Sequence, residues 1–308
     1  MIKTILSTEL PIGERFVIKK NVVKGPQPGK RLCIVTGTHG DELEGQMVCY
    51  LMNQRLKAHP DRLAGQVEIF PALNPLGIDT IQRGIPNFDL DMNRIFPGNR
   101  NGTMAEQAAY TIIEDLKGAD LVIDVHSSNL YLRETPQVRI NVLDEERLVP
   151  LAETLGVDFV WIHDAATVLE STLAHSLNST GTRCLVVELG VGQRINHKMC
   201  NRLVDGIFAL MADLGMWNSD EIGDFSASPI VCKGDHVAFL NAEASGVFLT
   251  ELKCGVTVEK GDEIGRIVEP LTGKVLSLVT SPVCGYMFTI RAYPIVYEGS
   301  LMARIFYK

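Results

Sequence analysis

The fold is decided by an apolar run that leads into a polar loop, Leu32-Cys33-Ile34-Val35-Thr36-Gly37-Thr38-His39-Gly40-Asp41-Glu42. The run is typical of a strand buried on both faces of a sheet. The glycines of the loop permit a sharp turn before a helix expected over residues 41–58. Catalytic zinc takes three His or carboxylate ligands, so His39 and Glu42 predict two of them. Such a pair also occurs by chance, and a distant third ligand is therefore needed.

A second apolar run, Leu121-Val122-Ile123-Asp124-Val125, ends in His126. Open α/β sheets place their sites beyond the carboxyl ends of parallel strands. We therefore expect His126 to lie beside the His39 loop and to be the third ligand of one zinc ion per chain. Asp124 falls on the same face of this strand and is the predicted hydrogen-bond acceptor that orients a ligand. The alternative for His126 is an ordinary histidine at a strand end.

A third apolar run, Cys184-Leu185-Val186-Val187, ends in Glu188. A carboxylate after buried strand residues is costly unless it lies in a cleft or is paired. Next to a metal-activated water, a carboxylate can take a proton and later hand it to a leaving amine. Glu188 is therefore a candidate general base, and the alternative is a strand-end side chain that faces solvent.

A long loop rich in Gly, Pro and Asn follows the strand expected over residues 67–70, and it carries Arg83 and Arg94. Structureless loops beyond about 12–15 residues are usually functional or disordered, and the apolar residues of this loop argue against disorder. Arginine binds carboxylates through paired hydrogen bonds and stabilises a developing oxyanion. The loop therefore predicts contacts with a substrate, although a solvated side chain is the commoner role of any single arginine.

The chain resembles the succinylglutamate desuccinylase/aspartoacylase family, whose members are related to the zinc carboxypeptidases. The resemblance spans residues 30–215 through four motifs in order: Gly37-Thr38-His39-Gly40-Asp41-Glu42, Asp91-Met92-Asn93-Arg94-Ile95-Phe96-Pro97-Gly98, Asp124-Val125-His126 and Val187-Glu188-Leu189-Gly190. The family commonly has Asp-Leu-Asn-Arg where this chain has Met92 in the second position.

The resemblance implies a role for each matched residue. It makes His39, Glu42 and His126 the zinc ligands and makes Glu188 the general base. It also assigns the carboxylate of the substrate to Asn93 and Arg94. Finally, it makes Arg83 the residue that polarises the carbonyl group.

The implied fold is α/β, with a mixed, largely parallel sheet covered by helices as in zinc carboxypeptidases, and a smaller all-β barrel-sandwich domain at the C-terminus. The implied enzyme is a zinc-dependent hydrolase that removes an acyl group from a small N-acylated amino acid or related amine. A metallocarboxypeptidase that acts on peptides would use the same residues. The expected partner of the protein is a small-molecule substrate, and a homo-oligomer is possible.

The two expected domains are residues 1–217, the deacylase domain, and residues 218–308, with a turn-rich linker over residues 217–229. The second domain contains a repeat, because residues 245–267 are echoed by residues 284–305. Such a two-fold pattern resembles biotinyl and lipoyl carrier domains. A noncatalytic carrier function is thus an alternative, although Lys274 lacks the surroundings expected of a modified lysine.

Composition excludes several classes of function. The chain has 308 residues, of which 46% are hydrophobic, and this is enough for a large core. A net charge of −8 argues against nucleic acid as a partner. The N-terminus lacks the apolar core of a signal peptide, and no segment is apolar for long enough to span a membrane. We therefore expect a cytoplasmic enzyme with reduced cysteines.

Overall fold

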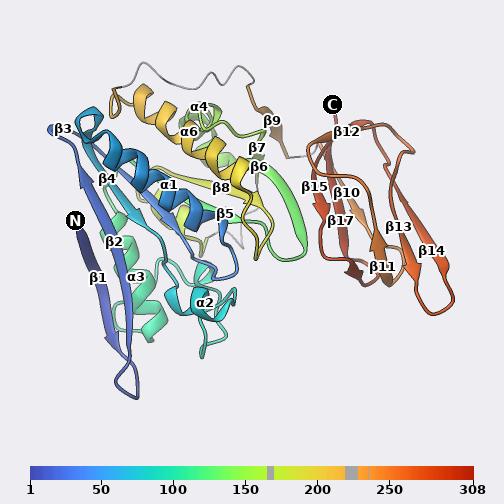
Figure 1. The fold of residues 1–308 in the computed structure, drawn as a ribbon, viewed down its shortest axis with the longest axis horizontal. Helices are drawn as coiled ribbons and strands as arrows, with labels where there is room; N and C mark the ends of the chain where they lie inside the picture. Colours follow the sequence, from blue (N-terminus) through green and yellow to red (C-terminus); the bar gives the residue numbers. More distant parts are fainter. Residues whose placement is uncertain (165–169, 219–227, 235) are drawn as a thin grey trace.

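A mixed sheet of 13 strands runs through the molecule, from the N-terminal hairpin at one end to strands of the C-terminal region at the other (Figure 1). The structure is a computed structural model that describes residues 1–164, 170–218, 228–234 and 236–308. In sheet order the main strands are β1 (Ile2–Glu9), β2 (Arg15–Lys24), β4 (Ala64–Phe70), β3 (Gln27–Thr36), β5 (Leu121–Ser127), β8 (Cys184–Gly190), β6 (Leu132–Asn141), β15 (Gly285–Arg291), β17 (Leu301–Phe306) and β10 (Val237–Asn241). Three further strands pair beside this path, namely β7 (Phe159–His163), β9 (Ile230–Lys233) and β12 (Val256–Val258).

Helices cover both faces of the sheet. One layer holds α1 (Glu44–Ala58), α4 (Glu145–Glu153) and α6 (His197–Asp213), and the opposite layer holds α3 (Met104–Leu116) and α5 (Leu173–Asn178). A short helix, α2 (Pro75–Thr80), follows β4. No helix in the described ranges has both the length and the apolar character needed to cross a membrane.

The second half of β3, from Leu32, is buried on both sides, as its continuous apolar run predicted. Leu32 and Ile34 pack into the core under α1 and α6, whereas Cys33 and Val35 pack into the core under α3. Successive side chains of a strand point to opposite faces, so one run of apolar residues contributes to both cores. The α/β class with its largely parallel central strands is confirmed.

The parallel strands β3, β5 and β8 end at the same edge of the sheet. In the pairing of β5 with β8, His126 lies opposite Glu188. The loop that carries His39 begins where β3 ends, one strand further along. The carboxyl-end rule for open α/β sheets therefore holds for all three predicted strand ends.

The C-terminal region is all-β. A second sheet contains β14 (Lys274–Thr280), β13 (Glu263–Glu269), β11 (Gly246–Leu249) and β16 (Ile295–Val296) in this order. The two halves of the repeat separate, because β11 and β13 enter this sheet while β15 and β17 join the large sheet through β6. The division at residue 217 stays a prediction, and most of the expected linker, residues 219–227, lies outside the described residues. Lys274 begins β14 opposite Glu269.

Three local features concern the N-terminal strands and the starts of two helices. The N-terminal residues form an edge hairpin, β1 and β2. Helix α3 begins with a capping box between Thr103 and Glu106, in which each residue satisfies a backbone N–H of the first turn. Helix α1 begins at Glu44 rather than Asp41, because the residues before it belong to the loop of the candidate site.

A buried charge cluster joins β2, β3 and β4 to α3. Lys20 Nζ lies 2.7 Å from Glu68 and 2.5 Å from Asp115, and Arg31 donates two hydrogen bonds to Glu68. Burial alone would raise the pKa of Glu68, but the hydrogen bonds from Arg31 and Lys20 outweigh it and lower that pKa. A lowered pKa means that the ionised form stabilises the fold at neutral pH.

Glu68→Gln is expected to lower the free energy of unfolding at pH 7 by about 3 kcal/mol, because the buried Lys20 and the partly buried Arg31 lose a carboxylate partner. The unfolded glutamate has a pKa of about 4.3, and the difference from wild type should shrink as pH falls below that value. Urea unfolding at a series of pH values measures this. The control is Glu114→Gln, which removes the charge of an exposed side chain 3.9 Å from Lys117 and should cost less than about 1 kcal/mol. Equal losses in the two variants would contradict the prediction.

Candidate active site

The loop between β3 and α1 is shaped by two glycines. Gly37 has a φ of 65°, in the left-handed region that glycine adopts readily. Gly40 lies so close to α2 that a Cβ atom there would be 1.9 Å from the carbonyl carbon of Gly77. The backbone N–H of Gly40 also donates to the Gln82 carbonyl oxygen at 3.0 Å. Close packing against α2 therefore fixes the loop and the His39 side chain within it.

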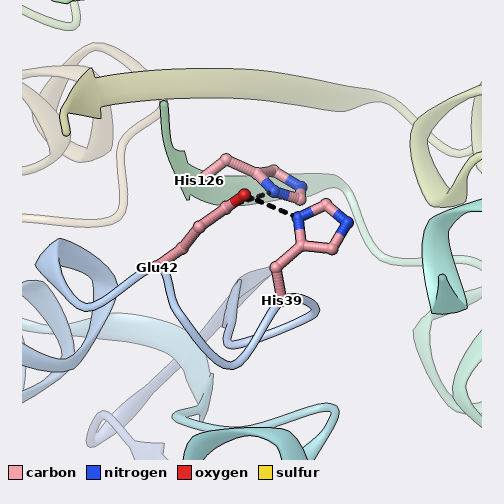
Figure 2. Close-up of side chains that lie close together, drawn as sticks. All are labelled: His39, Glu42 and His126. Atoms are coloured by element: carbon pink, nitrogen blue, oxygen red, sulfur yellow. Dashed lines mark hydrogen bonds and ion pairs between the residues drawn. The ribbon is translucent and has the colours of Figure 1, made fainter. Parts of the chain in front are cut away.

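The three predicted metal ligands come together at the ends of β3 and β5. Figure 2 shows the Glu42 carboxylate between the rings of His39 and His126. Nδ1 of His39 lies 2.7 Å from one oxygen of Glu42, and Nδ1 of His126 lies 2.9 Å from the other. One donor atom from each residue falls within 4.8 Å of the other two, and all three side chains are buried. Side chains that lie far apart in the sequence thus converge on one point.

A further carboxylate faces the outer nitrogen of each histidine. Asp91 Oδ1 lies 2.9 Å from His39 Nε2, and Asp124 Oδ2 lies 3.1 Å from His126 Nε2. Such contacts fix the orientation of a ligating ring and leave its other nitrogen for the metal. The strand pattern had indicated this role for Asp124, whereas the role of Asp91 was not foreseen.

The donor set fits a zinc ion. His39 Nδ1 is buried without a hydrogen-bond partner among the described residues, although it points at Glu42. Burial alone would raise the pKa of Glu42, but His39 and His126 beside it hold that pKa well below its usual range. The residue is therefore ionised, as a ligand must be. Two imidazole nitrogens and one carboxylate are a known ligand set of catalytic zinc.

Glu188 lies next to this group on β8, opposite His126 in the strand pairing. Its side chain is 14% exposed and lines the same cavity as the three ligands. Burial raises the pKa of Glu188 to about 7, although the Arg139 guanidinium acts in the opposite direction. A carboxyl group with a pKa near neutrality suits transfer of a proton in either direction at physiological pH.

The predicted loop residues all line this cavity, but their contacts differ. Arg83 donates to Glu42 at 3.0 Å and to Asp91 at 3.1 Å. The Asn93 side-chain oxygen accepts a hydrogen bond from the backbone N–H of Leu173, which leaves its NH₂ group for other partners. The exposed Arg94, at the end of the short 3₁₀ helix Met92–Arg94, donates only to the Asn93 carbonyl oxygen among the described residues.

The cavity has a volume of about 700 Å³ and extends well past the metal ligands. Its far wall holds polar residues that sequence reasoning did not assign, including Glu134, Arg139, Trp161 and Arg304. None of them lies in a motif. Arg304 comes from β17, so the C-terminal region contributes to the same cavity as the deacylase motifs.

The central part of this chain matches a known family. Residues 28–214 match the succinylglutamate desuccinylase/aspartoacylase catalytic domain. The chain therefore belongs to the succinylglutamate desuccinylase/aspartoacylase family, and the resemblance seen in the four motifs is confirmed. This is a family of deacylases that act on N-acyl amino acids.

Individual relatives are more distant. The N-alpha-acetyl-L-2,4-diaminobutyric acid deacetylase of Halomonas elongata is 24% identical over 261 residues, which cover 82% of this chain and 74% of that protein. A crystal structure of a succinylglutamate desuccinylase/aspartoacylase from Rhodobacter sphaeroides has a TM-score of 0.82 at 22% identity. The match covers 99% of this chain and 96% of that chain. The product-bound ectoine utilization protein EutE (DoeB) from Ruegeria pomeroyi has a TM-score of 0.84 at 19% identity, with coverages of 99% and 94%. At these identities the solved structures show a shared fold, which includes the C-terminal β region.

Proposed function

We propose that this protein is a zinc-dependent amidohydrolase that cleaves the acyl group from a small N-acylated amino acid or related amine. The observation that carries the proposal is the Glu188 carboxylate beside a His-Glu-His ligand set in one cavity. The family is one of deacylases, and a relative is named as a deacetylase of an N-acetylated diamino acid. These observations favour a linear amide as the bond that is cleaved.

The residues of the site have separate roles in the proposed reaction. His39, Glu42 and His126 would hold the zinc ion, which when bound supplies a Lewis acid and lowers the pKa of water. Glu188 takes a proton from the attacking water as the new C–O bond forms at the acyl carbon. When the C–N bond breaks, the same carboxyl group returns that proton to the departing nitrogen.

Two arginines serve different parts of the substrate. Arg83 contacts the Glu42 ligand and is the proposed donor to the oxyanion that develops on the acyl oxygen. Four arginines line the cavity, and three of them contact carboxylates of the protein. Arg94 alone has no carboxylate partner among the residues that the structure describes. It is therefore the proposed site for the carboxylate of the substrate, with the NH₂ group of Asn93 as a second donor.

The proposal is tested by release of primary amine from N-acetyl, N-formyl and N-succinyl amino acids and from short peptides, with zinc-loaded protein. Release from one N-acyl class supports the deacylase and identifies its substrates. Cleavage of peptides alone would favour the metallocarboxypeptidase. If zinc-loaded protein releases amine from none of these compounds, the proposed substrate class is wrong.

Arg94→Met is expected to raise the KM for a substrate with a free carboxylate by roughly 10- to 100-fold, because a hydrogen bond to a charged group contributes about 1.5–3 kcal/mol. The matched control is Arg100→Met, an exposed arginine of the same segment that does not line the cavity. Initial rates over a range of substrate concentrations give the KM of each variant. A substrate with its carboxylate amidated should show no difference between Arg94→Met and wild type, and a tenfold difference there would exclude the carboxylate contact.

A further inference from the structure

Four charged side chains form a continuous chain of contacts along the far wall of the cavity. Arg304 on β17 donates to Glu134 on β6 at 2.7 Å. Arg139, also on β6, donates to both oxygens of Glu134 at 2.9 Å. Nη1 of Arg139 in turn lies 3.4 Å from Oε1 of Glu188. The candidate base is therefore linked by three successive ion pairs to the C-terminal region.

The strand register explains why these residues meet. Thr289 on β15 pairs with Glu134 on one side and with Arg304 on the other, so the three residues lie in one row across β6, β15 and β17. Residues opposite each other in neighbouring strands share a face of the sheet. Within the row, the Thr289 hydroxyl also donates to Glu134 at 3.3 Å.

An irregularity in β6 places Arg139 on the same face as this row. Glu134 pairs with Gly190 and Gln137 pairs with Glu188, so three steps along β6 match two steps along β8. The extra residue of such a bulge reverses the face to which the following side chains point. Arg139 then lies diagonally across from Glu188, which is within reach of a long side chain.

The cluster is balanced in charge. Glu134 is 0% exposed, and a buried carboxylate of this kind needs its partners because an unpaired buried charge is strongly destabilising. Arg139 and Arg304 both lie over the Trp161 ring, at 5.7 and 5.4 Å from its centre. Two guanidinium groups face two carboxylates, so the charges of the cluster compensate one another.

We propose that Arg139 is a positioning residue for Glu188, and that the C-terminal region, through Arg304 and Glu134, holds Arg139 in the productive place. The C-terminal region is thereby a working part of the active site and not only a cover for it. The inference rests on the proposed function in one respect, namely that Glu188 is the base. A displaced base lowers the rate of the chemical step, whereas binding at Arg94 is unaffected, because none of the contacts of this cluster involves Arg94.

The kinetic test compares Arg304→Met with Arg304→Lys in the zinc-loaded protein. Arg304→Met should lower kcat by about 10- to 100-fold, since a displacement of about 1 Å is enough for such a loss, and should leave KM within about twofold. Arg304→Lys keeps a cation beside Glu134 and should recover part of kcat. The control is Arg266→Met, which removes an exposed arginine paired with Glu263 in the same region and should leave kcat unchanged.

A crystal structure of Arg304→Met supplies a readout that needs no substrate. The expected result is an Arg139 guanidinium that has moved away from Glu188, with the metal ligands in place. The inference is overturned if the contact between Arg139 and Glu188 persists, or if kcat of Arg304→Met equals that of wild type. The two proposals fail in different experiments. Full turnover by Glu188→Gln would show that Glu188 is not the base, and the crystal structure of Arg304→Met would still show whether Arg304 holds Arg139 in place.

Discussion

Glu188→Gln should lower kcat by roughly 1000-fold, the middle of the range that a general base contributes, while the protein still binds one zinc ion. Glutamine has the same shape as glutamate, so the position beside His126 and Arg139 stays filled. Its amide group cannot accept the proton of the attacking water or return one to the departing nitrogen. The loss should therefore appear in kcat, with the KM for a substrate held by Arg94 little changed.

The measurement pairs steady-state kinetics with the zinc content of the same sample. Glu153→Gln, an exposed glutamate on α4, is the matched control and should retain the wild-type rate. If Glu188→Gln keeps full turnover with zinc bound, Glu188 is not the base. If the variant loses its zinc, Glu188 contributes to the metal site, and the division of roles between His39, Glu42, His126 and Glu188 is wrong.

The strand ends could be predicted from sequence because the rule that places them is general. One apolar run leads into the loop that carries His39, and two others end in His126 and Glu188. Parallel strands have their carboxyl ends at the same edge of the sheet. The structure adds the register, in which His126 lies opposite Glu188. The resemblance to the family supplied the loop residues, because the spacing between Arg83 and Arg94 carries no periodic signal.

The far wall of the cavity could not be predicted in this way. Arg304 meets Glu134 across 170 positions of sequence, and the contact depends on β15 pairing with β6 in one particular register. Pattern reasoning gives the existence of strands, but not which distant strand becomes the neighbour. Charged and polar residues make up most of β6, and their pattern does not show which of them are buried or which residue is the partner of Arg139.

The start of α1 also differs from the sequence prediction because of contacts with distant residues. The apolar spacing of the first helix predicted a start at Asp41, but Glu42 is held instead by the backbone N–H of Ser127 at 3.1 Å and by Arg83. These contacts come from β5 and from the long loop, and they fix the residues before Glu44 in a non-helical turn. Tertiary contacts at functional sites commonly override local propensity.

Removal of the metal is the second change with a large expected effect. After dialysis against a chelator, the rate should fall below about 1% of that of the zinc-loaded protein, because the remaining residues supply neither a Lewis acid nor a lowered pKa for water. Added zinc should restore the rate in proportion to the zinc bound, up to one ion per chain. A metal-free sample that keeps its rate would exclude a catalytic role for the metal.

The ligand assignment is tested by a graded pair of substitutions on β5. His126→Gln removes a ligand and should weaken zinc binding by more than the roughly 10- to 100-fold expected of Asp124→Asn, which removes only the carboxylate that orients the ring. His197→Gln, at the exposed start of α6, is the control and should bind zinc as wild type does. Competition with a zinc-binding dye gives the affinity of each variant. Glu42 contacts both histidines and Arg83. Equal zinc affinities for His126→Gln and wild type would therefore mean that His39, Glu42 and His126 form an ion-pair cluster and not a metal site.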